Sequence, residues 1–245
     1  MARHLRTAGT ATLLLLAALY PLLRRPILTW GATAAEATAR LPGDELLEEA
    51  DGVSTRAITI LAPTTSVWPW IAQMGPSPRG GAYTYDWIEN LLGLEMHSVD
   101  RVIPEFQHPA VGDTIGLGAN QMRLERVEPE RTLAWRSEDG NWVWTFVLAE
   151  HGSATRLISR NRFRLPTLAT RLGMLPMEPG SLVMERKMLL GIKQRAERLA
   201  LRAIAQSGMP LGVTVDSEPP APALALEAHH EGKSAYDHDS RRDGT

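Results

Sequence analysis

Alternation of hydrophobic and polar residues predicts an antiparallel sheet across the middle of the chain. The stretch Ser54–Leu61 alternates and is rich in β-branched residues, as is typical of a strand. Similar runs recur between turn signals such as Glu128-Pro129-Glu130 and Asp139-Gly140-Asn141. The further runs are Thr114–Leu117, Met122–Val127, Thr132–Arg136, Trp142–Leu148 and Thr155–Phe163. Because the connecting turns are tight, we expect neighbouring strands to pair in antiparallel fashion.

Helical spacing predicts two short helices after the first strand and one long helix at the end of the domain. Thr64 or Thr65 is the expected cap of a helix that runs to Met74, and Asp86–Leu92 has the pattern of a second short helix. Ser181 is the expected cap of the long helix. The apolar stripe of this helix comprises Leu182, Met188, Ile192, Ala196, Leu199 and Ala203. The pattern therefore indicates an α+β protein whose long helix packs on the sheet.

The amino terminus contains an uncharged run, TAGTATLLLLAALYPLL, at residues 7–23, with arginines on both sides. As a helix it would be roughly 26 Å long, close to the thickness of a bilayer core. We favour a single-pass membrane anchor, because flanking arginines can reach the headgroups. A cleaved signal peptide and a buried helix remain alternatives. Positive charge on both flanks leaves the side of the membrane on which the domain lies open.

These patterns divide the chain into four parts. Residues 1–30 are the predicted membrane anchor and residues 31–53 an acidic linker, in which Glu45, Glu48 and Glu49 form a solvated face. Residues 54–206 are the folded domain. Residues 207–245 are polar and rich in Pro and Ala, and we expect a disordered tail there.

Composition and motifs exclude several kinds of function. With a formal net charge of -2, the 245-residue chain is not expected to bind nucleic acid, which requires a basic surface. The chain has no cysteine, which excludes thiolate nucleophiles and cysteine-ligated zinc. His97 and His108 lack further ligands at metal-site spacing, and no nucleotide-binding motif is present. We therefore expect no metal and no cofactor, and the sequence does not determine the oligomeric state.

The stretch from Arg79 to Gln107 mixes aromatic and polar residues in the way that a ligand pocket requires. His97 and Arg101 are the candidate catalytic residues, with His97 as the acid or base. The candidate ligand-binding residues are Tyr83, Tyr85, Asp86, Trp87, Glu89, Asn90 and Glu105, together with Met188 and Ile192 on the long helix.

Each of these candidates has a structural alternative. Asp86 and Glu89 can form a pair of carboxylates, but acids at the start of a helix often only favour its dipole. His97 can belong to a hydrogen-bonded network with nearby charges or be an ordinary loop histidine. Arg160 and Arg162 share one face of the last strand. If that face points inward they require acidic partners such as Glu89 or Glu105, and if it points outward they are solvated; we favour the outward position for at least one of them.

The order of elements resembles the SRPBCC superfamily, also called START-like or Bet v1-like. The resemblance covers about Ser54 to Gln206 and is most particular in RGGAYTYDWIENLLGLEMHSVDRVIPEFQ, in VGD at 111–113 and in MERKMLLGIKQRAE. It implies a helix-grip fold, in which a curved antiparallel sheet wraps around a long carboxy-terminal helix. It also implies a cavity for lipids, sterols, polyketides or hormones, and cyclase or aromatase activity in some members.

Three functions follow from these expectations. The first is binding, for carriage or sensing, of a hydrophobic small molecule or lipid by a membrane-tethered domain. The second is an enzyme similar to polyketide cyclases or dehydratases that uses the same cavity. The third is a non-catalytic envelope scaffold, in which the stretch 79–107 is an interaction surface.

Overall fold

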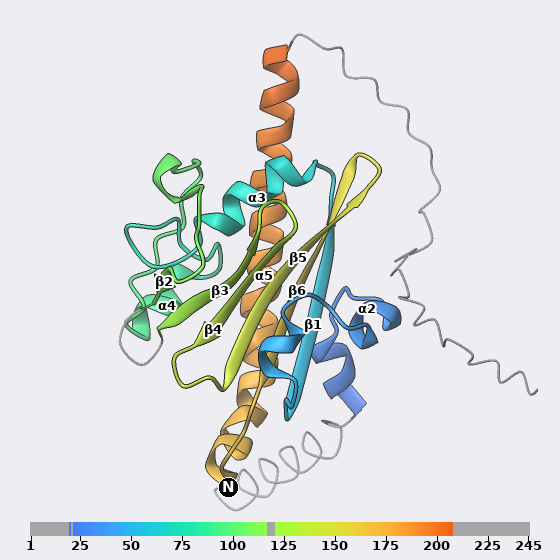
Figure 1. Cartoon of the computed structure of the whole chain (residues 1–245), viewed down its shortest axis with the longest axis vertical. Helices are drawn as coiled ribbons and strands as arrows, with labels where there is room; N and C mark the ends of the chain where they lie inside the picture. The colour runs from blue at the N-terminus through green and yellow to red at the C-terminus, as the bar shows by residue number, and fades with distance from the viewer. Residues whose placement is uncertain (1–19, 21, 117–120, 208–245) are drawn as a thin grey trace, which may run out of the picture. The chain divides into compact units, whose positions relative to one another are not determined.

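A six-stranded antiparallel sheet, with strand order β1-β6-β5-β4-β3-β2, is the centre of the fold in the computed structural model (Figure 1). The structure describes residues 20, 22–116 and 121–207. The strands are β1 (Gly52–Ile60), β2 (Thr114–Ile115), β3 (Met122–Glu128), β4 (Thr132–Ser137), β5 (Trp142–His151) and β6 (Ala154–Phe163). The predicted antiparallel sheet is therefore confirmed. Its first strand, β1, pairs with its last strand, β6.

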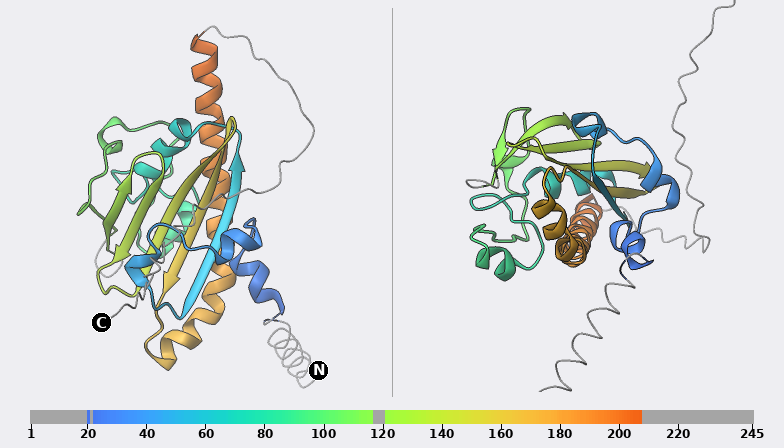
Figure 2. Two further views of the ribbon diagram at one scale, coloured as in Figure 1. Left: turned by 45° about the vertical axis from the view of Figure 1, so that its right-hand side comes forward. Right: turned by 90° about the horizontal axis from the view of Figure 1, so that it is seen from below.

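Helices cover one face of this sheet. The short helices α3 (Thr64–Ala72) and α4 (Asp86–Leu91) follow the first strand, and α5 (Leu168–Ser207) runs along the concave side of the sheet (Figure 2). Small elements complete the described part: α2 (Ala34–Thr38), η1 (Asp44–Leu47) and η2 (Pro104–Phe106). This is the helix-grip arrangement that the resemblance to the SRPBCC superfamily implies. The prediction of an α+β, helix-grip fold is thus confirmed.

The main core lies between the inner face of the sheet, α3 and α5. Trp135, Phe146 and Leu157 supply the sheet side, and Met188 and Ile192 supply the helix side, all at most 1% exposed. The alternation predicted for β5 places Trp144, Phe146 and Leu148 on this inner face. Burial of such large apolar side chains, each contributing on the order of 1.5–3 kcal/mol, holds the helix to the sheet.

The long helix begins at Leu168, which is 13 residues before the predicted cap at Ser181. Pro176 and Pro179 lie inside it, and Figure 2 shows that its first part bends away from the rest. Proline removes a helical hydrogen bond and kinks a helix, which accounts for the bend. The Ser181 hydroxyl donates instead to the backbone oxygen of Glu178 at 2.8 Å, so the predicted cap was wrong.

The predicted linker, 31–53, packs against the outer face of the sheet up to residue 51, and its last two residues already belong to β1. Thr33 and Glu36 form a capping box at the start of α2. Leu41 is buried against Ala57 and Ile158 of the sheet. The three glutamates of this segment predicted to be solvated, at 45, 48 and 49, are exposed. The segment therefore forms a second, thinner layer on the side of the sheet opposite α5.

The predicted membrane anchor lies largely outside the described residues, which include only Tyr20, Leu22 and Leu23 of the run at 7–23. Residues 22–28 are helical. Among the helices of the described residues, none combines the length and the apolar character needed to span a bilayer. The predicted tail also lies outside the described residues, apart from Ser207.

Candidate functional site

A cavity of about 490 Å³ lies between the inner face of the sheet and the first half of α5. Strands β1, β5 and β6 form one wall, α5 forms the other, and the helical segment 22–28 and α4 each contribute one residue at its margins. Its volume is within the range of small-molecule sites. The large apolar side chains that line it are Leu28, Met122, Trp142, Trp144, Phe163, Leu165, Met174, Met177, Met184 and Met188.

A buried polar cluster centred on Glu185 interrupts this apolar lining. The Glu185 carboxylate accepts hydrogen bonds from Arg56 and Ser159, both very short, and from the Asn161 amide at 3.3 Å. Arg56 is fully buried and donates further to the Ser181 hydroxyl at 2.9 Å and to the backbone oxygen of Ile27 at 3.2 Å. The cluster therefore links strands β1 and β6, helix α5 and the segment 22–28 at one wall of the cavity.

Burial raises the pKa of Glu185 above its ordinary value, and the positive charge of Arg56 opposes this rise. Loss of water around the carboxylate is the larger effect, because the residue is only 7% exposed. A raised pKa favours the protonated carboxyl group more than in an exposed glutamate. The carboxyl group can accept a hydrogen bond from a ligand when ionised or donate one when protonated.

Glu89 of α4 brings a second buried carboxyl group to the cavity. It is 8% exposed, and its Oε2 has no hydrogen-bond partner among the described residues. Burial raises its pKa, and the charge of Asp86 adds to the rise. The Thr84 hydroxyl opposes the shift, although it forms no hydrogen bond of normal geometry with this carboxyl group. Two polar groups of the cavity, Thr84 and Glu89, thus retain hydrogen-bonding capacity.

A third carboxylate, Glu178, ties α5 to the segment at 20–28. Arg24 donates to it from Nη2 at 2.8 Å and from Nε at 2.9 Å, and the Tyr20 hydroxyl makes a very short bond to it. Burial and the neighbouring carboxylate raise the pKa of Tyr20 to about 12. Because Arg24 and Tyr20 supply hydrogen bonds to both of its oxygens, Glu178 has a structural role at the margin of the cavity, where it joins α5 to the amino-terminal segment.

The structure places the predicted ligand-binding residues in different environments. Glu89 and Met188 line the cavity, whereas Ile192 is one turn further along α5 in the closed core. Tyr83 is also a core residue: it is 1% exposed, its hydroxyl donates to the backbone oxygen of Trp70 at 3.0 Å, and the Arg195 guanidinium lies 4.6 Å from its ring centre. Tyr83 does not line the cavity.

Asp86 and Asn90 hold the loop after α4. The Asp86 carboxylate accepts from the Ser98 backbone N–H at 2.7 Å and from its hydroxyl at 2.6 Å. Asn90 forms two hydrogen bonds with the backbone of Met96. Tyr85 and Trp87 are 37% and 69% exposed and do not line the cavity. The structural interpretation of Asp86 fits these contacts better than a pair of catalytic carboxylates.

His97, Arg101 and Glu105 are exposed and do not line the cavity. The predicted network around His97 is not formed by the described residues, in which Asp100 pairs instead with Arg195 at 2.8 Å. Arg101 contributes its backbone oxygen to the side chain of Gln73 at 3.0 Å. The predicted acid–base role of His97 therefore stays a prediction to which this geometry adds no support.

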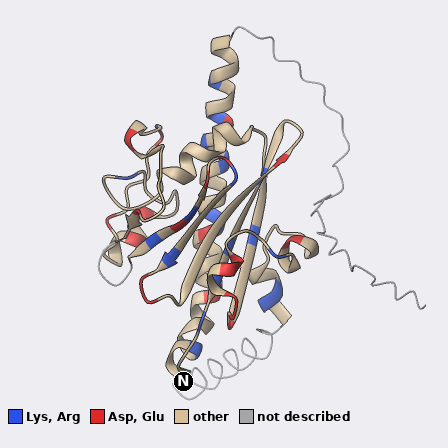
Figure 3. Cartoon of the chain, viewed as in Figure 1, with Lys and Arg blue, Asp and Glu red and all other residues tan. Residues whose placement is uncertain are grey.

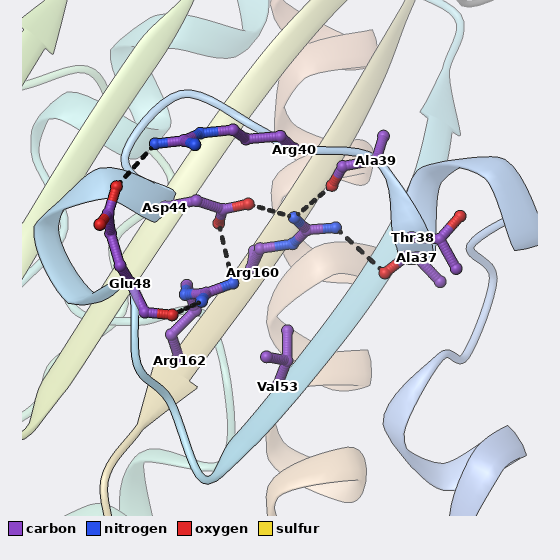
Figure 4. Close-up of a pocket in the computed structure, with 9 residues that line it drawn as sticks. All are labelled: Ala37, Thr38, Ala39, Arg40, Asp44, Glu48, Val53, Arg160 and Arg162. Atoms are coloured by element: carbon purple, nitrogen blue, oxygen red, sulfur yellow. Dashed lines mark hydrogen bonds and ion pairs between the residues drawn. The ribbon is translucent and has the colours of Figure 1, made fainter.

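A polar hollow of about 440 Å³ lies on the outer face, where residues 37–48 cover β1 and β6 (Figure 4). Arg160 is 2% exposed and donates to Asp44 at 2.7 Å and to the backbone oxygens of Ala39 and Glu36. Arg162 donates to the backbone oxygens of Leu47 and Glu48. Both arginines point outward, as favoured for at least one, but they are not solvated: the covering segment supplies their partners, so the hollow is structural.

Sequence reasoning missed the Glu185 cluster, although two signals for it were present. Glu185 lies three residues from both Leu182 and Met188, within the apolar stripe of the helix. Arg56 is the one charged residue of a strand that is otherwise uncharged. A charged residue on each of two apolar faces that pack together indicates a buried pair. Within the described residues, no group of three or more metal-ligating side chains comes together.

Comparison with known proteins identifies no relative by sequence. No family model matches the chain, and no curated protein matches it. Many solved structures are similar to it, and three of them illustrate the range. A protein from Mesorhizobium loti is 19% identical, with 60% of this chain and 98% of that one covered and a TM-score of 0.36. The Polyketide_cyc-like protein Cgl2372 from Corynebacterium glutamicum is 17% identical, with 64% and 94% covered and a TM-score of 0.32.

The third is a protein from Nitrosomonas europaea, 11% identical, with 61% of this chain and 97% of that one covered and a TM-score of 0.39. Likenesses of this size support no conclusion about function. The fold stated above rests on the strand order and the long helix of this chain.

Proposed function

We propose that the protein binds a hydrophobic small molecule or lipid in the cavity between the sheet and α5. The observation that supports this function is the combination, in about 490 Å³, of an aromatic and methionine-rich lining with a few buried polar groups. Ligand sites have this composition, because apolar contact supplies affinity and a few polar groups set orientation. Methionines also allow the wall to adapt to ligands of different shape.

The positions of the polar groups indicate what the ligand carries. Arg56 and Glu185 form a buried pair between β1 and α5, while Thr84 and Glu89 have side-chain oxygens without a hydrogen-bond partner among the described residues. A largely apolar molecule with one or two hydroxyl or carbonyl groups matches this lining. A fully ionic ligand does not, since most of the wall is apolar and desolvating its charge would be costly.

Titration of the full-length protein with the uncharged fluorophore N-phenyl-1-naphthylamine tests this function. The variant Met188→Trp fills the cavity from its helical wall and is expected to abolish the fluorescence increase. The overpacking itself costs roughly 1–3 kcal/mol, so an unfolding curve must show that the variant is folded. Leu201→Trp is the matched control, because Leu201 lies on the same helix, is 55% exposed and is far from the cavity.

Equal binding by the Met188→Trp variant and by the control would contradict the proposal. Extraction of the purified protein and mass spectrometry of the extract provide a second readout. A lipid-like molecule should be recovered from the wild-type protein and not from the Met188→Trp variant. If the Met188→Trp variant also kept the protein's function in cells, the result would favour the scaffold hypothesis over both ligand binding and catalysis in the cavity.

A cyclase or dehydratase activity is the second candidate, favoured by the two carboxyl groups with raised pKa in one cavity. Glu185, beside Arg56, would remove a proton from a carbon between two carbonyl groups. Glu89, which has no cationic partner among the described residues, would protonate the carbonyl under attack. Glu89→Gln should then stop consumption of a synthetic poly-β-ketone while leaving fluorophore binding intact. If turnover survived both in the Glu89→Gln variant and in the Glu185→Gln variant, this mechanism would be excluded.

The proposal includes tethering of the cavity to a membrane by residues 7–23. Support comes from the sequence, in which the run is uncharged and flanked by arginines. Alkaline carbonate extraction of membranes that contain the full-length protein should leave it in the pellet. Release into the supernatant would favour a cleaved signal peptide or a buried helix.

A further inference from the structure

One end of the described structure exposes six large apolar side chains. They belong to the segment 22–28 and to the first three turns of α5, and we call them the apolar end. Its members are 48–75% exposed and comprise Leu22, Leu23, Leu168, Leu172, Leu175 and Met177. Over 168–177 the only charged residue is Arg171. Surfaces of this kind mark sites of contact with a partner or a membrane.

The exposed part of α5 differs from the part that follows it. From Glu185 onward the helix buries Met188, Leu189 and Ile192 against the sheet. Before Glu178, it extends past the lower edge of the sheet (Figures 1 and 2), and the other described residues leave Leu168, Leu172, Leu175 and Met177 exposed. A helix that only completed a soluble core would carry polar residues on its outer side. The apolar end therefore requires an occupant.

We propose that the apolar end lies in the interfacial layer of a lipid bilayer and that the cavity opens beside it. Two observations select a lipid surface as the occupant. The uncharged run at 7–23 ends at Leu22 and Leu23, so the segment predicted to enter the membrane leads directly into this surface. Basic residues border the surface, as expected next to anionic headgroups; they are Arg24, Arg25, Arg164 and Arg171.

Figure 3 shows basic positions both on the helical segment that begins at residue 22 and near the start of α5. The ion pair between Arg24 and Glu178 joins these two elements. Arg24 and Arg171 remain 45% and 62% exposed at their side chains despite acidic neighbours. Their guanidinium groups can therefore still reach phosphates at the membrane surface.

The same turns of α5 also form part of the cavity wall. Met174 and Met177 line the cavity, and Leu28 lines it from the segment that carries Leu22 and Leu23. A ligand that left the bilayer between these elements would meet methionine side chains before it met water. This part of the inference rests on the proposed ligand-binding function, whereas the contact between the apolar end and the bilayer does not.

The absence of cysteine from the natural chain permits a direct test. Leu172→Cys, labelled with bimane in the full-length protein, reports the environment of the apolar end. Leu201→Cys is the matched control: it replaces a 55% exposed leucine of the same helix, 29 residues or roughly 43 Å further along. Both proteins are reconstituted with vesicles of phosphatidylcholine and phosphatidylglycerol in equal parts, with or without lipids that carry a doxyl quencher.

We expect the label at residue 172 to shift its emission to the blue and to lose intensity to the doxyl lipids, while the label at residue 201 does neither. Quenching at neither position would overturn the proposal, even if the protein floats with the vesicles through residues 7–23. A blue shift at residue 172 without quenching would also overturn it, because it would show that protein, from this chain or a second copy, covers the surface.

A double variant separates this inference from the cavity itself. Leu172→Asp with Leu175→Asp should abolish the blue shift of a bimane placed at Leu168→Cys and should slow the transfer of a fluorescent lipid from vesicles into the protein. Binding of N-phenyl-1-naphthylamine in detergent should not change. If fluorophore binding fails in the wild-type protein while lipid quenching at residue 172 persists, the result contradicts the proposed ligand-binding function. It supports the proposed contact between the apolar end and the bilayer.

Discussion

Two buried arginine–carboxylate pairs lie on opposite faces of the same two strands, and they differ in what surrounds them. On the outer face Arg160 pairs with Asp44, and all three of its nitrogens also donate to oxygens of β1 or the covering segment. On the inner face Arg56 pairs with Glu185 at the wall of the cavity. Both arginines are at most 2% exposed.

The difference shows that a buried ion pair does not by itself mark a functional site. The outer pair is closed by backbone oxygens of residues 36–39 and fixes that segment to the sheet. The inner pair borders an apolar space large enough for a ligand. A buried charge requires partners in either place. Asp44 Oδ1 of the outer pair has no hydrogen bond, but Arg162 Nη1 lies 3.7 Å from it. The inner pair shares its apolar cavity with Thr84 and Glu89, whose side-chain oxygens Oγ1 and Oε2 have no hydrogen-bond partner among the described residues.

Removal of Asp44 should have the largest effect on stability. Asp44→Ala leaves Arg160 buried without its carboxylate, which typically costs about 3–5 kcal/mol. Glu48→Ala is the control, because its pair with Arg40 is exposed and contributes about 0–1 kcal/mol. Urea unfolding followed by circular dichroism measures both. If the two variants lost the same stability, the covering segment would not depend on the outer pair.

Glu185→Gln should have an intermediate effect that depends on pH. The amide keeps the shape and can still accept from Arg56, so we expect a loss of about 1–3 kcal/mol. Because burial raises the folded-state pKa of Glu185, the wild-type protein loses stability as pH rises from the ordinary glutamate value through the raised value. The variant lacks this titration.

The difference in unfolding free energy between the two proteins should therefore be widest near the ordinary glutamate pKa, about pH 4, and should narrow as pH rises above it. Urea titrations at intervals across this range measure it. A gap that widens with pH would mean that Arg56 outweighs burial and lowers the pKa of Glu185.

Glu89→Gln should have a small effect of the opposite sign. No cation pairs with Glu89 among the described residues, so the substitution leaves no charge without a partner. Because the pKa of Glu89 is raised in the folded state, the wild-type protein loses stability as pH rises above the ordinary glutamate pKa. The variant has no carboxyl group at this position and does not show this loss. The variant should gain less than about 1 kcal/mol at neutral pH and nothing at acid pH. Destabilisation at neutral pH would reveal a partner for the Glu89 carboxylate.

His97→Ala should have the smallest effect. His97 is exposed in the loop between α4 and η2 and does not line the cavity. We expect unfolding free energy within about 0.5 kcal/mol of wild type and unchanged binding of N-phenyl-1-naphthylamine. A marked loss of binding would restore the sequence-based hypothesis that His97 belongs to the site.

The fold was largely predictable because its signals are local. The alternation in β1, β5 and β6 and the spacing of Met188, Ile192 and Ala196 are each visible within about ten residues of sequence. The start of α5 was not predictable in the same way, since Pro176 and Pro179 are ordinarily helix-breaking residues. Local propensity there is overridden by the contacts of Glu178 and Ser181 with distant parts of the chain.

The candidate site was harder to predict because its polar residues come from separate elements. Glu89 and Met188 were identified from local composition, and both line the cavity. Tyr83, Tyr85 and Trp87 have similar composition, but the first is a core residue and the other two are exposed outside the cavity. Aromatic residues occur in cores, on surfaces and in pockets, so their clustering in sequence does not distinguish these environments.

The sequence by itself determined the order of elements, the alternation along the strands and an uncharged amino-terminal run, and its resemblance to a known superfamily implied the helix-grip class. Only the tertiary structure decided that Arg56 meets Glu185, which is 129 residues away, and that Arg160 meets Asp44, which is 116 residues away. The physical reason is that secondary structure follows from neighbours along the chain. The partner of a buried charge instead depends on which elements pack together. That packing places the Arg160–Asp44 pair under a covering segment and the Arg56–Glu185 pair beside a cavity.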